Sequence, residues 1–176
     1  MIRAVVVSAV VHPSPAPSEL AYSLVRLMVR DHLGSTCPGK LHIARGAHGK
    51  PFLVDVEGLY FSVSHSGPWV AACIGKTPIG IDIQTPPSIL RPATLRRFGL
   101  PQGTSPEAFA MAWARREAAL KAIGTGFAQG PNPAAESLCH IQSHTLPNHI
   151  ALAIAEQVSI IEALPAQNAC QYNQDS

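Results

Sequence analysis

The sequence is poor in charged residues. Asp, Glu, Lys and Arg make up only 14% of its 176 residues, whereas 47% of the residues are hydrophobic. Disordered chains show the opposite balance, so this composition excludes disorder and predicts a folded protein. A chain of this length corresponds to about one domain and can bury a core without disulfides or metals.

A long hydrophobic run is also missing. No stretch approaches the roughly 18 uninterrupted apolar residues of a membrane span. The apolar N-terminus lacks the small-residue cleavage pattern of a signal peptide before its prolines. We therefore interpret residues 2–11, which are rich in β-branched side chains, as a buried strand. These features predict a cytoplasmic protein that makes no contact with a membrane.

The cysteines and histidines lack the spacing of a metal cage. Four cysteines are scattered along the chain, at Cys37, Cys73, Cys139 and Cys170. No two of them form a close pair, which argues against a zinc site and against a disulfide scaffold. The histidines show no metal-ligand spacing either.

A strong excess of charge of one sign is absent as well. The chain has 13 Lys and Arg against 11 Asp and Glu, for a net charge of +2. A nucleic-acid-binding protein would show a dense basic stripe. We therefore expect no nucleic-acid partner.

The hydrophobic patterning predicts a mixed α+β fold, because strands, helix and strands follow one another twice. The predicted strands are residues 2–11, 41–45, 52–54, 60–66, 69–75, 79–84, 137–143, 149–155 and 158–163. The predicted helices run from a cap at Ser18 to Leu33, over 88–98, and over 106–123. The last dozen residues are predicted to form a frayed tail.

The segment IGIDIQ, residues 79–84, is the first candidate for chemistry. In a strand, Gly80, Asp82 and Gln84 share one face, with alternate side chains roughly 6.5–7 Å apart. An acid and an amide at that spacing could bind one cation, and Gly80 leaves space for a close approach. The alternative is an edge strand whose polar face is solvated, in which Asp82 has no special role.

The helix at 106–123 contains the second candidate. Trp113, Glu117 and Lys121 are spaced at i, i+4 and i+8, so they form one stripe. The acid and the base could hold a metal and a phosphate side by side, and the small alanines nearby indicate tight packing. The alternative is an ordinary surface ion pair between Glu117 and Lys121.

The segment SVSHSG is the third candidate. Its three serines, at 62, 64 and 66, share one face of a strand, and His65 points the other way or leaves the strand at the turn. Neighbouring Ser and His side chains diverge in a strand and so form no catalytic dyad. They could bind a phosphate at the strand end, or the serines could form only turn hydrogen bonds.

Taken in order, these blocks resemble a known family. The series GKPFL, FSVSHSG, VAACIG, PIGIDIQ and WARREAALKAIGTG, from about Gly49 to Gly126, is similar to the 4′-phosphopantetheinyl transferases. Within them it resembles the pseudo-dimeric surfactin-type branch. The resemblance implies an enzyme that transfers the 4′-phosphopantetheine group from coenzyme A to a serine of an apo acyl or peptidyl carrier protein. It further implies dependence on Mg²⁺ and release of 3′,5′-ADP.

The resemblance also implies roles for single residues. Asp82 stands at the family's metal-binding Asp, and Glu117 stands at a second ligand that is also the proposed base. Lys121 stands at the lysine that contacts the coenzyme A phosphates. Gln84 stands where surfactin-type enzymes usually have a second acid, so we expect weaker or differently hydrated Mg²⁺. Arg116 replaces the usual lysine before the glutamate.

Other residues are implied to bind coenzyme A. Lys50 of the GKP block and the pair Ser64 and His65 fall where the family holds the adenosine and its 3′-phosphate, alongside Asp82 and Lys121. The N-terminal part is short for the branch, and Arg3 and Arg45 are the candidates there for arginines that contact the 3′-phosphate.

The implied architecture is a 4′-phosphopantetheinyl transferase-like fold of two similar lobes, each with a helix packed on a small antiparallel sheet. We expect an N-terminal lobe over 1–78, a C-terminal lobe over 79–165 and a flexible tail over 166–176. Two lobes in one chain imply a monomer. An acidic carrier protein is the expected partner, attracted by a modest basic rim. That rim would include Arg96, Arg97 and Arg115.

Two alternatives remain at this point. Gln84 supports a non-catalytic relative that binds coenzyme A or a carrier protein without transfer. A small α+β binding protein with a chance motif match is the other, which the ordered series of blocks disfavours.

Overall fold

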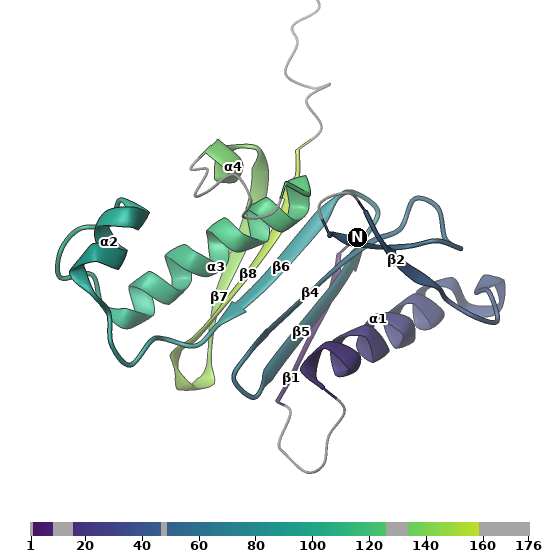
Figure 1. Cartoon of the computed structure of the whole chain (residues 1–176). Coiled ribbons are helices and arrows are strands. Elements are labelled where there is room, and N and C mark those ends of the chain that lie inside the picture. The colour runs from purple at the N-terminus through teal and green to yellow at the C-terminus, as the bar shows by residue number, and fades with distance from the viewer. Residues whose placement is uncertain (1, 9–15, 47–48, 126–133, 159–176) are drawn as a thin grey trace, which may run out of the picture.

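Two three-stranded antiparallel sheets organise the protein, and a long helix packs against each (Figure 1). The computed structural model describes residues 2–8, 16–46, 49–125 and 134–158. The first sheet has the order β1-β5-β4, formed by Arg3–Ser8, Trp69–Gly75 and Tyr60–Ser66. The second has the order β6-β8-β7, formed by Ile79–Gln84, Ile150–Gln157 and Cys139–Leu146.

The helices and the remaining short elements complete the described fold. The long helices are α1, Pro17–Leu33, which covers the first sheet, and α3, Pro106–Ile123, which covers the second. The short elements are β2 (Ile43–Arg45), β3 (Pro51–Leu53), α2 (Pro92–Phe98), α4 (Ala134–Ser137) and the 3₁₀ turns η1 (Gly34–Thr36) and η3 (Pro147–His149). Strands β2 and β3 pair with each other in a separate two-stranded hairpin.

This arrangement confirms the α+β prediction. Strands β4, β5 and β6 and helix α3 have the predicted bounds. The equivalence of the two halves as similar lobes, and the boundary after residue 78, stay predictions.

Several predicted bounds were wrong. Helix α1 begins at Pro17 after Ala16, and no side chain caps it, so Ser18 lies inside the helix. Proline is favoured at the first helical position, because its missing N–H is not needed there. For the same reason α2 begins at Pro92 rather than at 88. Helix α4 was not predicted, and strand β7 begins at Cys139 rather than at 137.

The C-terminal prediction is only partly tested. A separate strand over 158–163 was predicted, but β8 ends at Gln157 and Val158 is not in a strand. Residues 159–163 and the predicted tail lie outside the described residues.

Helix α1 packs its apolar face on the first sheet. Val25 and Val29 are fully buried and lie in one cluster with Phe61, Ala72 and Ile74 of the sheet. Their spacing of four residues places them on one side of the helix. This cluster holds α1 against the first sheet in the N-terminal half of the chain.

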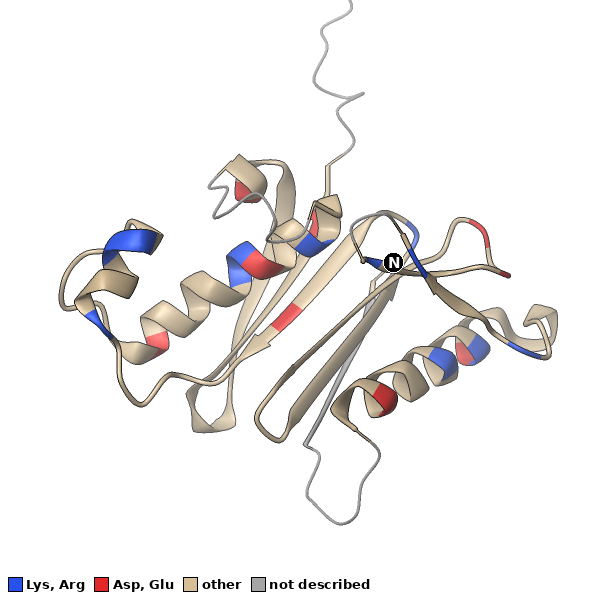
Figure 2. Cartoon of the chain, viewed as in Figure 1, with Lys and Arg blue, Asp and Glu red and all other residues tan. Residues whose placement is uncertain are grey.

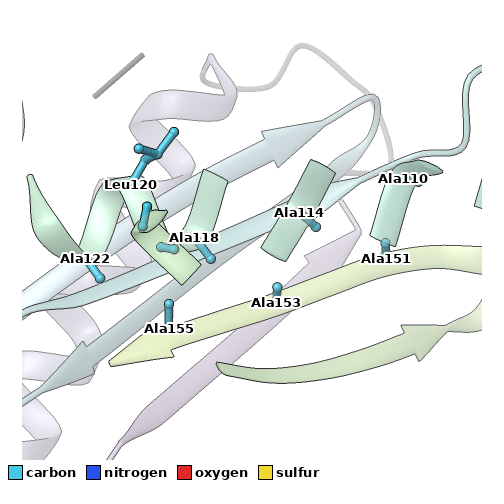
Figure 3. Packing of buried hydrophobic residues seen from close by; sticks show 10 residues of the cluster. Ala110, Ala114, Ala118, Leu120, Ala122, Ala151, Ala153 and Ala155 are labelled. Atoms are coloured by element: carbon cyan, nitrogen blue, oxygen red, sulfur yellow. The ribbon is translucent and has the colours of Figure 1, made fainter. Parts of the chain in front are cut away.

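Helix α3 approaches the second sheet unusually closely, because both contact surfaces consist of alanine. Every fourth residue of its buried face is alanine, at 110, 114, 118 and 122. They meet a second row of alanines on β8, at 151, 153 and 155 (Figure 3). Small side chains allow the helix backbone to lie near the strands, and any larger residue there would create overlap.

Gly80 extends this close contact to β6. A Cβ atom at residue 80 would overlap the carbonyl oxygen of Ala118 and lie 2.6 Å from the amide nitrogen of Ala122. The space that the sequence suggested at Gly80 is therefore filled by the backbone of α3. Only glycine permits this approach, which places Asp82 beneath the helix.

The two sheets meet where three serine hydroxyls of β4 contact the edge of β6. The amides of Ile81, Ile83 and Thr85 donate to the hydroxyl oxygens of Ser62, Ser64 and Ser66, at 3.1, 3.3 and 3.0 Å. We call these three contacts the serine ladder. An unpaired strand edge leaves its N–H groups without partners, so the ladder satisfies them with side chains instead of a further strand.

The described cysteines form no disulfide. Cys37, Cys73 and Cys139 are free thiols. Burial raises the pKa of the Cys73 thiol to about 12, so it is inert at neutral pH. Among the helices that the structure describes, none combines the length and apolarity needed to cross a bilayer.

Candidate active site

A cavity of about 460 Å³ lies where the two sheets meet, and α1, β4, β6 and α3 line it with residues from both halves of the chain. Helix α1 contributes Tyr22, β4 contributes Ser64 and His65, β6 contributes Asp82 and Gln84, and α3 contributes Trp113, Glu117 and Lys121. A smaller adjoining cavity of about 250 Å³ shares Glu117 and Lys121 and reaches Lys50. Figure 2 shows that acidic and basic positions of α3 lie beside the acidic position of β6.

Asp82 is the buried carboxylate of this site. Its residue exposure is only 5%, so the alternative of a solvated edge strand is wrong. Its Oδ1 accepts hydrogen bonds from Lys121 Nζ and Ser64 Oγ, each at 2.6 Å. Burial raises the pKa of the Asp82 carboxyl, while the Lys121 ammonium and the Ser64 hydroxyl oppose that shift.

Lys121 lies between the helix and the strand. Its ammonium donates to the backbone carbonyl of Ile81 at 3.0 Å as well as to Asp82. Its partner is thus an acid on β6, 39 positions earlier in the chain, rather than a surface neighbour on its own helix. Because the ammonium lines the cavity, it can also meet a bound anion there.

Glu117 is partly buried on the same wall. Burial and the nearby charge of Asp82 raise the pKa of Glu117 to about 7, against the lowering effect of Lys121. A carboxylate with a pKa near the working pH is well matched to removing a proton from a hydroxyl. This side chain can therefore act as a general base, unlike a solvated surface glutamate.

The donor atoms around Asp82 suit Mg²⁺. Asp82 Oδ2 is buried and has no hydrogen-bond partner within the described residues, so it is available to a cation. Glu117 and Gln84 add carboxylate and amide oxygens on the same cavity. No three or more His, Cys, Asp or Glu side chains cluster in a metal-binding group in the part described. Mg²⁺ needs no such group, because it is commonly held by one or two carboxylates and substrate phosphates.

The opposite wall carries positive charge. Arg45 lines the cavity and donates to the Tyr22 hydroxyl at 3.1 Å and to the Gly49 carbonyl at 2.9 Å. Lys50 Nζ donates to the carbonyl of Ala122, near the end of α3, at 2.9 Å. It therefore connects the N-terminal half to the helix of the other half. Burial lowers the pKa of the Lys50 ammonium.

The serine–histidine segment is divided between two environments. Ser64 is 8% exposed and its hydroxyl is engaged with Asp82 and with the amide of Ile83. His65 is exposed and lines the cavity. The three serines share a face as predicted, and they accept the amides of Ile81 and Ile83 on β6 and of Thr85 just after it, rather than bonding within a turn.

The three arginines of the expected basic rim differ in exposure and in their contacts. Arg96 and Arg97 on α2 are exposed. Arg115 instead contacts Glu136 at 3.4 Å and Ser143 at 3.0 Å, so its charge is partly compensated. The side chain of Arg3 lies outside what the structure describes.

Most of the predicted site residues thus meet on two adjoining cavities. Asp82, Gln84, Glu117, Lys121, Ser64 and His65 line the larger one, and Lys50 lines the smaller. The roles assigned to them stay predictions. Tyr22 was missed, because its hydroxyl gave no signal within an amphipathic helix. The contact between Ser64 and Asp82 was also missed, because it depends on how β4 meets β6.

Comparison with known proteins points to one superfamily. Residues 78–161 match the sequence model of the 4′-phosphopantetheinyl transferase superfamily. The chain is 30% identical over 92 residues to a 4′-phosphopantetheinyl transferase of Bacillus subtilis, which covers 45% of this chain and 39% of the relative. It is 27% identical over 124 residues to the 4′-phosphopantetheinyl transferase psf-1 of Bacillus pumilus. This match covers 64% of this chain and 53% of the relative.

A third relative gives the same result. The chain is 32% identical over 91 residues to the 4′-phosphopantetheinyl transferase gsp of Aneurinibacillus migulanus, which covers 47% of this chain and 38% of the relative. The chain therefore spans about half or less of the length of these curated relatives. The matched segment contains both acids that face the cavity, and over these residues the chain is similar to the 4′-phosphopantetheinyl transferase superfamily.

Proposed function

We propose that the protein transfers the 4′-phosphopantetheine group of coenzyme A to a serine of an apo acyl or peptidyl carrier protein and releases 3′,5′-ADP. The observation that carries this proposal is the meeting of Asp82, Glu117 and Lys121 on one cavity at the junction of the sheets. The superfamily match over residues 78–161 supports it, because that segment supplies all three side chains.

Asp82, Glu117 and Gln84 are the residues that would hold Mg²⁺. When bound, the cation would neutralise charge on the pyrophosphate of coenzyme A as that charge develops. Asp82 would offer its buried Oδ2, which has no hydrogen-bond partner among the described residues, and Gln84 would offer its neutral amide oxygen. Lys121, on α3, holds Oδ1 of Asp82 in place through its hydrogen bond.

Glu117 would act as the general base. It would accept the proton of the carrier serine while the serine oxygen bonds to the phosphorus of the phosphopantetheine group. The bond from that phosphorus to the oxygen of 3′,5′-ADP breaks, and the ADP leaves with the electron pair. Lys121 would steady the charge of the leaving phosphate as a nearby cation. A positioned base of this kind contributes about 10²–10⁴-fold to the rate.

The positive wall would hold the nucleotide end of coenzyme A. Arg45, Lys50 and His65 are the side chains that could meet the 3′-phosphate and the adenosine. Arg45 is already oriented by Tyr22 and Gly49, which reduces the entropy lost on binding. The acidic carrier partner, its attraction to Arg96 and Arg97, the monomeric state and the cytoplasmic location remain predictions.

Intact mass spectrometry tests the proposed function. The full chain is incubated with coenzyme A, Mg²⁺ and an apo carrier protein. The expected result is a carrier that gains one phosphopantetheine, with no gain when the metal is chelated. If carriers of every class tested stayed unmodified, the proposed transfer would be contradicted.

The second candidate is a non-catalytic relative, which the amide at Gln84 favours. It predicts that coenzyme A binds measurably while no carrier is modified. Calorimetric titration with coenzyme A, run beside the transfer assay, separates the two candidates.

Gln84→Glu is expected to lower the Mg²⁺ concentration needed for half-maximal transfer by about tenfold, because a carboxylate adds a negative charge beside the cation. The measurement is a Mg²⁺ titration of the transfer rate at saturating coenzyme A. Gln142→Glu is the matched control, since Gln142 is exposed on β7 of the same sheet. An unchanged Mg²⁺ requirement in Gln84→Glu would mean that residue 84 is remote from the metal.

A further inference from the structure

Asp82 has a strongly unequal environment at its two oxygens. Oδ1 accepts from both Lys121 Nζ and Ser64 Oγ, each at 2.6 Å. Oδ2 is equally buried but accepts from no group within the described residues. Rotation of a carboxylate about its last bond is soft, so without specific partners the two oxygens would exchange places. The two donors on Oδ1 therefore decide which oxygen is left for a ligand.

We infer that Ser64 is a positioning residue that fixes the carboxylate of Asp82 with Oδ2 open to the metal. This inference rests on the proposed function, since it concerns the same site. Ser64 belongs to the serine ladder, in which each serine accepts one backbone amide, from Ile81, Ile83 or Thr85. Among the hydrogen bonds of the described residues, Ser64 is the serine of the ladder that also donates to a carboxylate. Its second contact therefore exceeds what the junction of the sheets requires.

The hydroxyl of Ser64 is poorly placed for the role that the resemblance implies. A hydroxyl has one proton to donate, and a phosphate can only accept. That proton is committed to Asp82, and the residue is only 8% exposed. Contact with the 3′-phosphate of coenzyme A would break the hydrogen bond to Asp82. The neighbouring His65 is exposed and lines the cavity, so it can meet a phosphate there without this cost.

The inference predicts a loss of metal affinity without a loss of nucleotide affinity. Groups that orient a metal ligand typically contribute about 10- to 100-fold to metal affinity. Ser64→Ala should therefore weaken metal binding by about 10-fold or more. The affinity for coenzyme A, measured without metal, should not change. Ser64→Thr, which keeps the hydroxyl, should restore most of the metal affinity.

The experiment titrates Mn²⁺ into the full chain with coenzyme A present and reads free Mn²⁺ by electron paramagnetic resonance. Ser62→Ala is the matched control, because it removes the neighbouring hydroxyl of the ladder, which accepts the amide of Ile81. Each variant leaves one backbone amide without its acceptor, and Ser64→Ala also removes a donor to Asp82, so the thermal midpoint is measured for each. The expected result is weaker Mn²⁺ binding in Ser64→Ala and wild-type binding in Ser62→Ala.

Three results would overturn the inference. Equal Mn²⁺ affinity in the two alanine variants would reduce Ser64 to a structural residue. Weaker metal-free binding of coenzyme A in Ser64→Ala would assign Ser64 to the nucleotide instead. In either case a wild-type chain that still modifies a carrier leaves the proposed function intact. A wild-type chain that neither binds Mn²⁺ nor modifies a carrier would overturn the proposed function and this inference together.

Discussion

Gly80→Ala is expected to destabilise the protein by about 3 kcal/mol or more and to abolish transfer. The added methyl group would overlap the carbonyl oxygen of Ala118 and approach Lys121 Cβ to 2.9 Å. Overpacking usually costs about 1–3 kcal/mol, and here backbone atoms rather than flexible side chains must move. Any retreat of α3 would also carry Glu117 and Lys121 away from Asp82, since all three line one cavity.

Urea unfolding followed by circular dichroism measures the destabilisation, and the carrier assay measures the activity. Gly39→Ala is the matched control. Gly39 has no positive φ, and an added Cβ there meets nothing within 4 Å. The control should unfold like the wild type or slightly later, because alanine restricts the unfolded chain. A Gly80→Ala protein with wild-type stability would show that α3 does not approach β6 as closely as described.

Glu117→Gln is expected to lower the rate of transfer by about 10²–10⁴-fold while the chain stays folded. The amide keeps the size of the side chain but cannot accept the proton of the carrier serine at neutral pH. Asp82→Asn should lower the rate by about 100-fold or more, because the charged oxygen offered to the cation is lost. Glu117→Gln should not greatly lower stability, since burial disfavours the charge there. Asp82→Asn removes the counter-charge of Lys121, so some loss of stability is expected in that variant.

The rates are measured at saturating coenzyme A and Mg²⁺, with thermal midpoints recorded in parallel. Glu107→Gln is the control for helix α3, because Glu107 is exposed in its first turn. Asp55→Asn is the control for the aspartate, because Asp55 pairs with His42 outside the cavity. Full activity in Glu117→Gln would remove the general base from the proposed mechanism.

Strand β6 and helix α3 could be predicted to the residue because their signals are local. Alternating isoleucines define β6, and Pro106 and Gly124 stand at the two ends of α3. The functional prediction for Asp82 could not be decided in the same way. Its local pattern fits a solvated edge as well as a buried site, and only the position of α3 above Gly80 separates the two.

The partners of the charged groups were harder to predict than the groups themselves. Lys121 was expected beside Glu117 on one helix face, yet its closest described partner is Asp82 on β6. Lys50 was expected at coenzyme A, and its ammonium lies on the carbonyl of Ala122. Such contacts join segments 39 and 72 positions apart, so no periodicity within one segment encodes them.

The serine ladder limits how the two walls of the cavity can move past each other. Serines occupy alternate positions of β4, with Val63 and His65 between them. A slide of one residue would set valine and histidine against the amides of β6, which would then lose their acceptors. The next matching arrangement requires a slide of two residues, roughly 6.5–7 Å along the strand. The width of the cavity can therefore not be adjusted by small slides of β4 along β6, because the intermediate registers would leave the amides without acceptors.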